Sequence, residues 1–335
     1  STYKLKQSSY KSEPTNNLYA FCIERAAILL RRSGYFGMII PAGVLGLDDA
    51  VSLRKVLLKR FTYNFCSTYA IRPSKLFDGV DQRLCIYIGK FNKEVESKIL
   101  TTRYHHWNSE ERNTLFPCLE YNESFHYKRL ERIPQVGSSE AASILAKLES
   151  KNGRLVLNYF ASNRHGCLMH YHRSPRYWIR AMDFEQYFKS PTRTRSVHHF
   201  RNLYFKDLNE GKVIGALLNS SLFFFWFVSV GNGRNITGSD VENFPVGEFS
   251  QDILKNLPDI FDQLMFDYKA NSFLRVRQDC EFQEFRPSLS KPTIDKIDGL
   301  LARYYGFTDK ELDFIINYDT KYRMGRDSGN ENDNE

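Results

Sequence analysis

The sequence lacks a run of apolar residues long enough to cross a membrane, since a spanning helix needs roughly 18–20 of them in succession. The longest candidate, 217–230, is interrupted by Asn219, Ser220 and Ser221. No secretory or transit peptide is recognisable. The chain begins at Ser1 rather than at methionine, and we expect it to be a fragment of a longer protein. We therefore expect a cytoplasmic protein that does not contact membranes.

Cysteine is scarce, with six residues in 335 and no paired spacing, so we expect free thiols rather than a disulfide framework. The nearest approach to a zinc pattern is Cys167, His170 and His172, with His165 close by. It lacks a second pair of ligands at zinc-site spacing, and we expect no metal site.

Hydrolytic chemistry has equally little support in the sequence. Asp81, Glu96 and Lys98 faintly resemble the acid–acid–lysine set of a magnesium nuclease, but charged connectors produce such matches by chance. No nucleophile pattern of the Ser/His/Asp or Cys/His kind stands out. An internal repeat is also absent.

The stretch 17–41 has the clearest local pattern. Apolar residues recur at helical spacing, and Gly34 follows the last turn as a helix stop. The predicted buried stripe is Leu18, Cys22, Ala26 and Leu29. Residues 35–40 are then apolar without alternation, which predicts a strand covered on both faces in a parallel α/β sheet. Because ligands bind outside the carboxyl ends of such strands, the backbone around Pro41 is a candidate ligand wall.

Further elements follow from periodicity and turn residues. Asp48 or Asp49 is expected to cap a helix over 51–60. Strands over 63–71 and 83–91 are expected to form an antiparallel pair at the end of the sheet, and 100–106 is a candidate strand. Later helices are predicted over 139–149, 211–219, 221–230, 253–271, 294–305 and 309–317.

Positive charge is concentrated between Arg164 and Arg201. This stretch holds eight Arg or Lys residues against two acids, and this excess of +6 is most of the chain's net charge of +8. Aromatic residues lie between the charged ones. Either it is a solvated face or it contacts nucleic-acid phosphates, and the shortage of acidic partners favours phosphates. The phosphate candidates are Arg193, Arg195, His198, His199 and Arg201.

A glycine-rich loop follows the helix predicted over 221–230. Its residues Asn232, Arg234 and Asn235 either read base edges, since Arg pairs with guanine and Asn with adenine, or serve a backbone turn.

Four segments in order carry a resemblance to a known family: NLYAFCIERAAILL with GYFGMIIPAGVL, then LRKVLLKRF, then KLFDGVDQRLCIYIGK, then LLNSSLFFFWFVSVGNGRNITGSDVENFPV. They resemble the gamma-class adenine-N6 DNA methyltransferases of restriction–modification systems, the family that includes type IIG proteins. The segment IDKIDGLLARYYGFTDKELDFIINYDTKYRM resembles the C-terminal tail of the large members.

The resemblance implies an α/β fold: the second half of a Rossmann-like methyltransferase sheet, then an α+β DNA specificity domain with a helical C-terminal tail. The implied limits are 1–130 for the partial catalytic domain, 131–290 for the target-recognition domain and 291–325 for the helical segment. Residues 326–335 are expected to be disordered.

The resemblance also implies roles for individual residues. The S-adenosylmethionine contacts fall on Asn17, Leu18, Phe21 and Cys22, and Pro41 joins them as a cofactor candidate from its place at the end of the predicted strand. Phe77 matches the aromatic residue that stacks on the flipped target adenine, and Lys75 beside it is a DNA-binding candidate. From the residues alone, the helix 17–29 is ordinary core packing and Phe77 a buried loop anchor, and only the order of the motifs favours the functional readings.

Two expected motifs are absent. The family's Phe-x-Gly-x-Gly cofactor loop and Asn-Pro-Pro-Tyr tetrad should precede Asn17, and neither occurs. We therefore expect the complete enzyme to methylate adenine N6 in duplex DNA and this chain to be inactive alone, because positioning of the target amine is missing. The expected partners are duplex DNA and the missing N-terminal half of the catalytic domain, with or without a nuclease domain. The alternative is a non-catalytic, sequence-specific DNA-binding module, or a degenerate or split methyltransferase.

Overall fold

The computed structural model describes residues 10–91, 96–151, 153–192 and 200–325. The chain divides into two units, each described by itself below. The first takes the residues up to Ser143 together with Val228–Gly233, and the second takes Ile144–Phe227 and the residues from Arg234 onward. The domain boundaries expected at 130/131 and 290/291 are not tested by this division and stay predictions.

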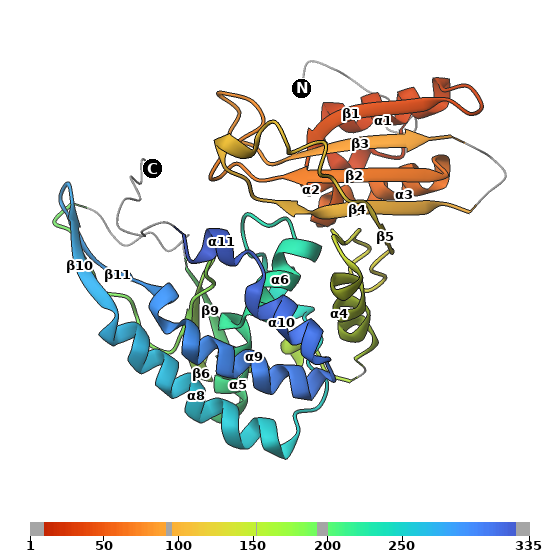
Figure 1. Ribbon diagram of the computed structural model, residues 1–335. Helices are drawn as coiled ribbons and strands as arrows, with labels where there is room; N and C mark the ends of the chain where they lie inside the picture. Colours follow the sequence, from red (N-terminus) through yellow and green to blue (C-terminus); the bar gives the residue numbers. More distant parts are fainter. Residues whose placement is uncertain (1–9, 92–95, 152, 193–199, 326–335) are drawn as a thin grey trace. The chain divides into compact units, whose positions relative to one another are not determined.

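The first unit is built on a five-stranded mixed sheet (Figure 1). Its strands, in spatial order, are β1 (Tyr35–Pro41), β3 (Leu84–Lys90), β2 (Tyr63–Tyr69), β4 (Lys98–His105) and β5 (Asn122–Ser124). Because β3 is antiparallel to both β1 and β2, those two strands run in the same direction. The predicted antiparallel pairing of β2 with β3 is confirmed. Its predicted place at the end of the sheet is wrong, since β4 pairs parallel with β2 and β5 extends the sheet further.

Two helices, α1 (Leu18–Leu29) and α3 (Val51–Arg60), cover one face of this sheet (Figure 1). Ile23, Ile40 and Leu53 belong to a single buried cluster between these layers. The short helix α2 (Gly43–Gly46) follows β1 directly. The expected cap on α3 is wrong: a turn of 3-10 helix takes up Asp48 and Asp49, and Ala50 is the N-terminal flanking residue.

The predicted buried stripe of α1 is wrong, although the helix itself is confirmed. Leu18, Cys22 and Leu29 are exposed, and Ala26 is half-buried. The buried residues are instead Ala20, Ile23, Glu24 and Ala27. Apolar residues lie all round this helix, so their spacing did not single out one face. Glu24 is buried because its carboxylate accepts hydrogen bonds from the backbone N–H groups of Lys11 (3.0 Å) and Ser12 (2.8 Å).

Strand β1 differs from the expectation of a strand buried on both faces in a parallel sheet. Among the strands that the structure describes it pairs with β3 alone, and it lies at an edge of the sheet. Met38 and Ile40 pack toward the helices, whereas Ile39 points to the opposite face and is 46% exposed. On that opposite face, Trp107 and Leu115, from the segment between β4 and β5, cluster with Tyr69 of β2 and with Leu84 and Ile86 of β3, separately from the helical core.

The second unit contains two small sheets that the sequence pattern does not predict. In one, β6 (Cys167–His172) lies between β7 (Ala181–Met182) and β9 (Phe200–Phe205). In the other, β11 (Cys280–Phe285) lies between β10 (Ser272–Arg277) and β8 (Phe188–Lys189). All of these pairs are antiparallel. The hairpin β10–β11 extends from the end of α8 (Figure 1).

The helices predicted from periodicity are confirmed within one to three residues at most ends. They are α4 (Ser139–Ser150), α5 (Leu208–Asn219), α6 (Ser221–Val230), α8 (Gln251–Ala270), α9 (Lys291–Tyr305) and α10 (Asp309–Asn317), and the short α7 (Gly238–Glu242) and α11 (Thr320–Arg323) are additional. Within the second unit α5, α8 and α9 pack on one another. The aromatic residues of α6 are buried.

The absence of a membrane-spanning run and the free cysteines were both expected from the sequence. No single helix of the described residues has both the length and the apolarity to cross a membrane; α5 and α6 together pass that test as a pair bent by 64°. All six cysteines are free, as predicted.

Candidate functional site

The candidate ligand wall lies at one end of the first-unit sheet. Pro41, the last residue of β1, and Tyr69, the last residue of β2, are both paired with Leu84 of β3. The segment that follows β1 and the loop that follows β2 therefore leave the sheet at the same end. In α/β sheets this carboxyl end is where ligands bind.

The N-terminal end of α1 meets the segment that follows β1. The hydroxyl groups of Thr15 and Ser52 are 3.2 Å apart, which joins the turn before α1 to the start of α3. Asn17 is exposed and donates from Nδ2 to the Thr15 carbonyl (3.0 Å). Leu18 is 65% exposed, an unusual environment for leucine at the start of a helix.

The other two helix candidates lie deeper along α1. The Phe21 ring is half-buried and packs edge-on against Tyr10, with ring centroids 5.4 Å apart. Cys22 is exposed one turn after Leu18. The structure thus brings Asn17 and Leu18 to the same end of the sheet as Pro41, while Phe21 is engaged in packing.

Two buried arginines hold the segment that follows β1. Arg54 donates from Nη1 to the carbonyls of Val44 and Leu47 (both 2.8 Å) and from Nε to that of Glu131 (2.7 Å). Burial, followed by the neighbouring Arg132, lowers the pKa of Arg54 to about 10, so it remains charged at neutral pH. Sequence reasoning missed this role, because an arginine in an amphipathic helix is normally assigned to the solvent face.

Arg132 is the second of these arginines. It is buried and forms an ion pair with Asp48 at 2.9 Å, within the segment that follows β1. The wall beside Pro41 is therefore fixed by charge-assisted hydrogen bonds at several points, and such bonds are stronger than neutral ones.

The loop after β2 presents Phe77. Leu76 is buried, while the adjacent Phe77 is 46% exposed, so Leu76 is the residue that anchors this loop in the core. Arg112 holds the loop by donating from Nη2 to the Leu76 carbonyl (2.8 Å). Lys75 forms an exposed ion pair with Asp81 at 2.7 Å. A cavity of about 430 Å³ adjoins these side chains, lined in part by Trp107.

The phosphate candidates of the second unit are only partly described. Arg193, Arg195, His198 and His199 lie outside the described residues. Arg201 is exposed on β9, paired in register with Tyr171 of β6.

The glycine-loop candidates do not form one set. Asn232 belongs to the first unit, where its carbonyl accepts a hydrogen bond from Arg83 Nη1 (3.2 Å). In the second unit Arg234 is exposed, and Asn235 accepts a hydrogen bond at Oδ1 from the Ser174 hydroxyl (2.6 Å). Asn235 therefore lies next to a residue that lines the main cavity of this unit.

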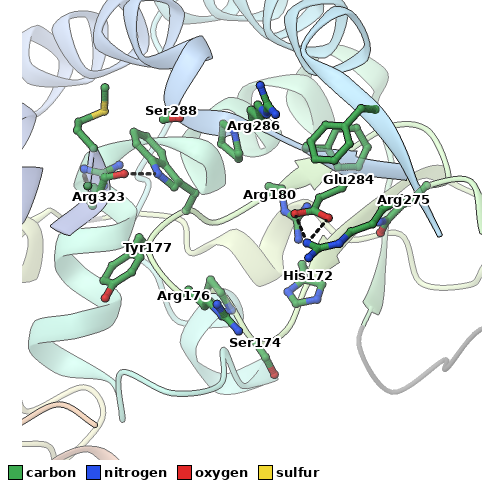
Figure 2. A pocket seen from close by; sticks show the side chains of 18 of the residues that line it. His172, Ser174, Arg176, Tyr177, Arg180, Arg275, Glu284, Arg286, Ser288 and Arg323 are labelled. Carbon is green, nitrogen blue, oxygen red and sulfur yellow. Dashed lines mark hydrogen bonds and ion pairs between the residues drawn. The ribbon is translucent and has the colours of Figure 1, made fainter. Parts of the chain in front are cut away.

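That cavity, of about 500 Å³, is lined largely by basic side chains (Figure 2). Its lining comes from residues 172–180 at the end of β6 and after it, from Gln186, from the hairpin β10–β11 with the turn after it, and from residues 322–325 at the end of α11. Six arginines line it: Arg176, Arg180, Arg275, Arg277, Arg286 and Arg323. The basic stretch predicted from sequence contributes only the first two of them.

The hairpin contributes Arg275 and Arg277, and the turn after it contributes Arg286; sequence reasoning missed all three. In β10 the residues Phe273, Arg275 and Arg277 line the cavity, whereas Leu274 and Val276 between them are exposed and absent from its lining. That alternation of arginine with apolar residues was the available signal for a strand with one basic face.

Neither of the metal alternatives is supported among the described residues, where no cluster of three or more potential metal ligands occurs. Cys167 and His170 are three residues apart on β6 and so point to opposite faces, and His170 Nδ1 lies 2.8 Å from Asn202 Oδ1. Asp81 precedes the start of β3 beside Tyr69, whereas Lys98 pairs with Tyr63 at the other end of β2. The nuclease-like set is therefore spread over both ends of the sheet.

Comparisons with known proteins give only distant similarities. No protein-family model matches this chain, and no curated protein matches it. Solved structures similar to it include the type ISP restriction–modification enzyme LlaGI, as a nuclease-deletion mutant with a DNA substrate mimic (TM-score 0.43, 9% identity, 78% of this chain and 38% of that one). Others are the type IIG restriction endonuclease BpuSI (TM-score 0.32, 11% identity, 89% and 48%) and the DrdV–DNA complex (TM-score 0.30, 14% identity, 36% and 13%).

The chain thus spans less than half the length of each of these three proteins. At TM-scores below 0.5 the similarities establish neither the topology nor the activity of this chain. A functional assignment has to depend on its own residues.

Proposed function

We propose that this chain is the C-terminal part of a restriction–modification DNA methyltransferase, which transfers a methyl group from S-adenosylmethionine to adenine N6 in duplex DNA. The observation that supports the proposal most is the meeting of Leu18, Pro41 and the Phe77 loop at the carboxyl end of β1 and β2. Those are the residues for which the family resemblance implies cofactor and target-base contacts.

The residues present are suited to one side of the cofactor. S-adenosylmethionine, when bound, supplies the methyl group. Leu18 offers an exposed apolar side chain and Pro41 a half-buried one, which suit the faces of an adenine ring. Asn17 would add an amide beside them. Cys22, exposed one turn further along α1, is the weakest of the proposed contacts.

Phe77 would replace part of the stacking that an adenine loses when it leaves the duplex, worth about 1–3 kcal/mol per base. This role needs an exposed ring on a fixed backbone. Phe77 has both features, because the buried Leu76 and the hydrogen bond from Arg112 hold the loop. Lys75 would contact a phosphate near the target base, after exchanging its exposed partner Asp81.

DNA binding would involve the basic stretch of the second unit. Arg201 is exposed and, with Arg193 and Arg195, would contact phosphates. Arg234 and Asn235 would approach the bases. Because phosphate contacts release counterions, the affinity for duplex DNA should fall steeply with salt.

The proposal is tested in the complete protein that contains this chain, by quantifying N6-methyladenine in DNA with mass spectrometry. We expect the wild-type protein to methylate adenine. Phe77→Ala should lower the methylation rate at least about tenfold, since a loss of about 1.4 kcal/mol of stacking corresponds to tenfold, and Phe77→Trp should largely keep the rate. Phe116→Ala is the matched control, since Phe116 is a similarly exposed phenylalanine outside the Phe77 loop.

Two results would contradict the proposal in different ways. Salt-sensitive duplex binding without methylation would make the protein a non-catalytic DNA-binding module. Absence of both methylation and duplex binding would remove the DNA assignment altogether.

A further inference from the structure

The arginine-lined cavity of the second unit has a strong charge imbalance. Six arginines face a single carboxylate, Glu284, and both oxygens of that carboxylate accept hydrogen bonds from Arg275 Nη1 (3.1 and 2.9 Å; Figure 2). The formal charges of the lining side chains therefore sum to +5 around a volume of about 500 Å³, although Asp298 and Asp319, which do not line the cavity, partly offset the charge of Arg323. Concentrated positive charge in a concave site attracts an anion strongly.

The guanidinium groups are held in place by aromatic rings. Arg286 lies over the Phe273 ring at 4.7 Å and Arg180 over the Phe285 ring at 5.5 Å. Arg323 lies over Trp178 at 4.1 Å and also donates to the Ser221 hydroxyl (3.1 Å). Because these side chains are already ordered, an anion would bind them with a smaller entropic cost than it would flexible surface arginines.

Burial removes water from part of this cluster. It lowers the pKa of both Arg180 and Arg323, yet both remain charged at neutral pH. A bound anion would compensate for that lost hydration. Arginine is the residue best matched to a phosphate, because its planar N–H groups contact two oxygens at once.

The size and the aromatic content of the cavity narrow the class of anion. Its volume lies in the range of small-molecule sites, about 300–1,000 Å³, and is too small for a double helix. Tyr177, Trp178, Phe273 and Tyr322 line it among the arginines. Aromatic rings beside arginines provide stacking for a base next to charge for a phosphate.

We propose that this cavity binds one nucleotide unit, with its phosphate among Arg180, Arg275 and Arg286 and its base against the aromatic wall. The unit is either a free nucleoside monophosphate or a nucleotide of a single DNA strand. This ligand class goes beyond the proposed function, because it requires neither methyl transfer nor recognition of a duplex.

The test is isothermal titration of the full chain with inorganic phosphate, with dAMP, and with a short single-stranded oligonucleotide. We expect dAMP to bind more tightly than phosphate. Arg286→Gln should weaken dAMP binding about tenfold or more, since a charge-assisted hydrogen bond contributes about 1.5–3 kcal/mol. Arg303→Gln is the matched control, because Arg303 is an exposed arginine on α9 that does not line this cavity.

Arg180→Gln serves as a second variant at a less exposed position, and circular dichroism checks its folding. Because Arg286 is exposed, its replacement leaves the core intact. Arg286→Gln therefore still tests nucleotide binding if Arg180→Gln fails to fold. Displacement of dAMP by the oligonucleotide would assign the site to a DNA strand, and retention of dAMP would assign it to the free nucleotide. The proposal is overturned if dAMP does not bind, or binds equally to wild type and Arg286→Gln.

Discussion

Asp298 on α9 has the most unusual environment of the described carboxyl groups for which a shifted pKa is resolved. It is buried, and its two oxygens accept hydrogen bonds from the backbone N–H groups of Ser221 and Leu222 at the start of α6, both at 3.2 Å. Burial raises its pKa to about 6, although these bonds and Arg323 act in the opposite direction. The carboxyl group thus satisfies donors at a helix N-terminus that would otherwise have no intrahelical partner.

The raised pKa predicts how stability depends on pH. Between the unfolded value of 3.8 and the folded value of about 6, the folded chain holds the proton more tightly. The stability that this group contributes is therefore fully present below pH 4 and is lost as the pH rises through 6, by on the order of 3 kcal/mol. Asp298→Asn should remove this dependence.

Urea unfolding of wild type and of Asp298→Asn, measured between pH 4 and pH 7.5, provides the comparison. The difference in unfolding free energy between the two should change with pH, whereas Asp309→Asn, an exposed acid at the start of α10, should follow wild type. Parallel pH profiles for wild type and Asp298→Asn would show that the carboxyl group does not titrate in this range.

Among the elements, the segment after β1 takes most of its side-chain hydrogen bonds from Arg54 of α3, beside the ion pair of Arg132 with Asp48. Arg54 donates three hydrogen bonds to backbone carbonyls, and two of them are within residues 44–47. Lysine keeps the charge but lacks the planar guanidinium group with its several N–H donors. Arg54→Lys would therefore leave buried carbonyls without hydrogen-bond donors. We expect a loss of about 2–4 kcal/mol in unfolding free energy.

Hydrogen exchange followed by mass spectrometry locates this effect. In Arg54→Lys the backbone amides of residues 42–50 should lose protection before the strands do. Lys59→Ala, at an exposed position on the same helix, should change stability by less than about 0.5 kcal/mol. Unchanged protection of residues 42–50 in Arg54→Lys would mean that the wall is held by other contacts.

The elements also show what a sequence can and cannot predict. Helix α1 was located correctly because its spacing is helical, but its buried face was not, because apolar residues lie all round it and Glu24 is buried through distant backbone donors. The hairpin β10–β11 was missed although the alternation of Arg275 and Arg277 with Leu274 and Val276 is a strand pattern. Leu76 and Phe77 are adjacent and similar, and only the packing shows which of them is the anchor.

On the scale of the whole molecule, the net charge of +8 and the excess between Arg164 and Arg201 were readable from the sequence. The main concentration of arginines in the second unit was not. It combines residues near 176, 275 and 323, which are separated by up to about 150 positions in the chain. Periodicity and local charge report neighbours along the chain, whereas a cavity depends on which segments pack together.

The open edge at β1 has a consequence for handling the protein. An edge strand with apolar side chains is a template for pairing with another chain, and natural edges are usually protected by charge or by a covering segment. Among the described strands only β3 pairs with β1, and Ile39 is exposed on it. We expect this chain, when expressed alone, to self-associate through β1 and to aggregate on concentration.

Ile39→Lys should therefore raise the solubility and shift the chain toward monomer in sedimentation velocity, with little loss of stability because the side chain is already partly exposed. Ile88→Lys places the same charge on the same face of β3, one strand away from the edge, and should have a smaller effect. Equal effects of the two substitutions would mean that the apolar face, and not the strand edge, causes the association. If Ile39→Lys has the larger effect, this one substitution on the edge strand would keep the protein soluble at concentrations where the wild-type chain precipitates.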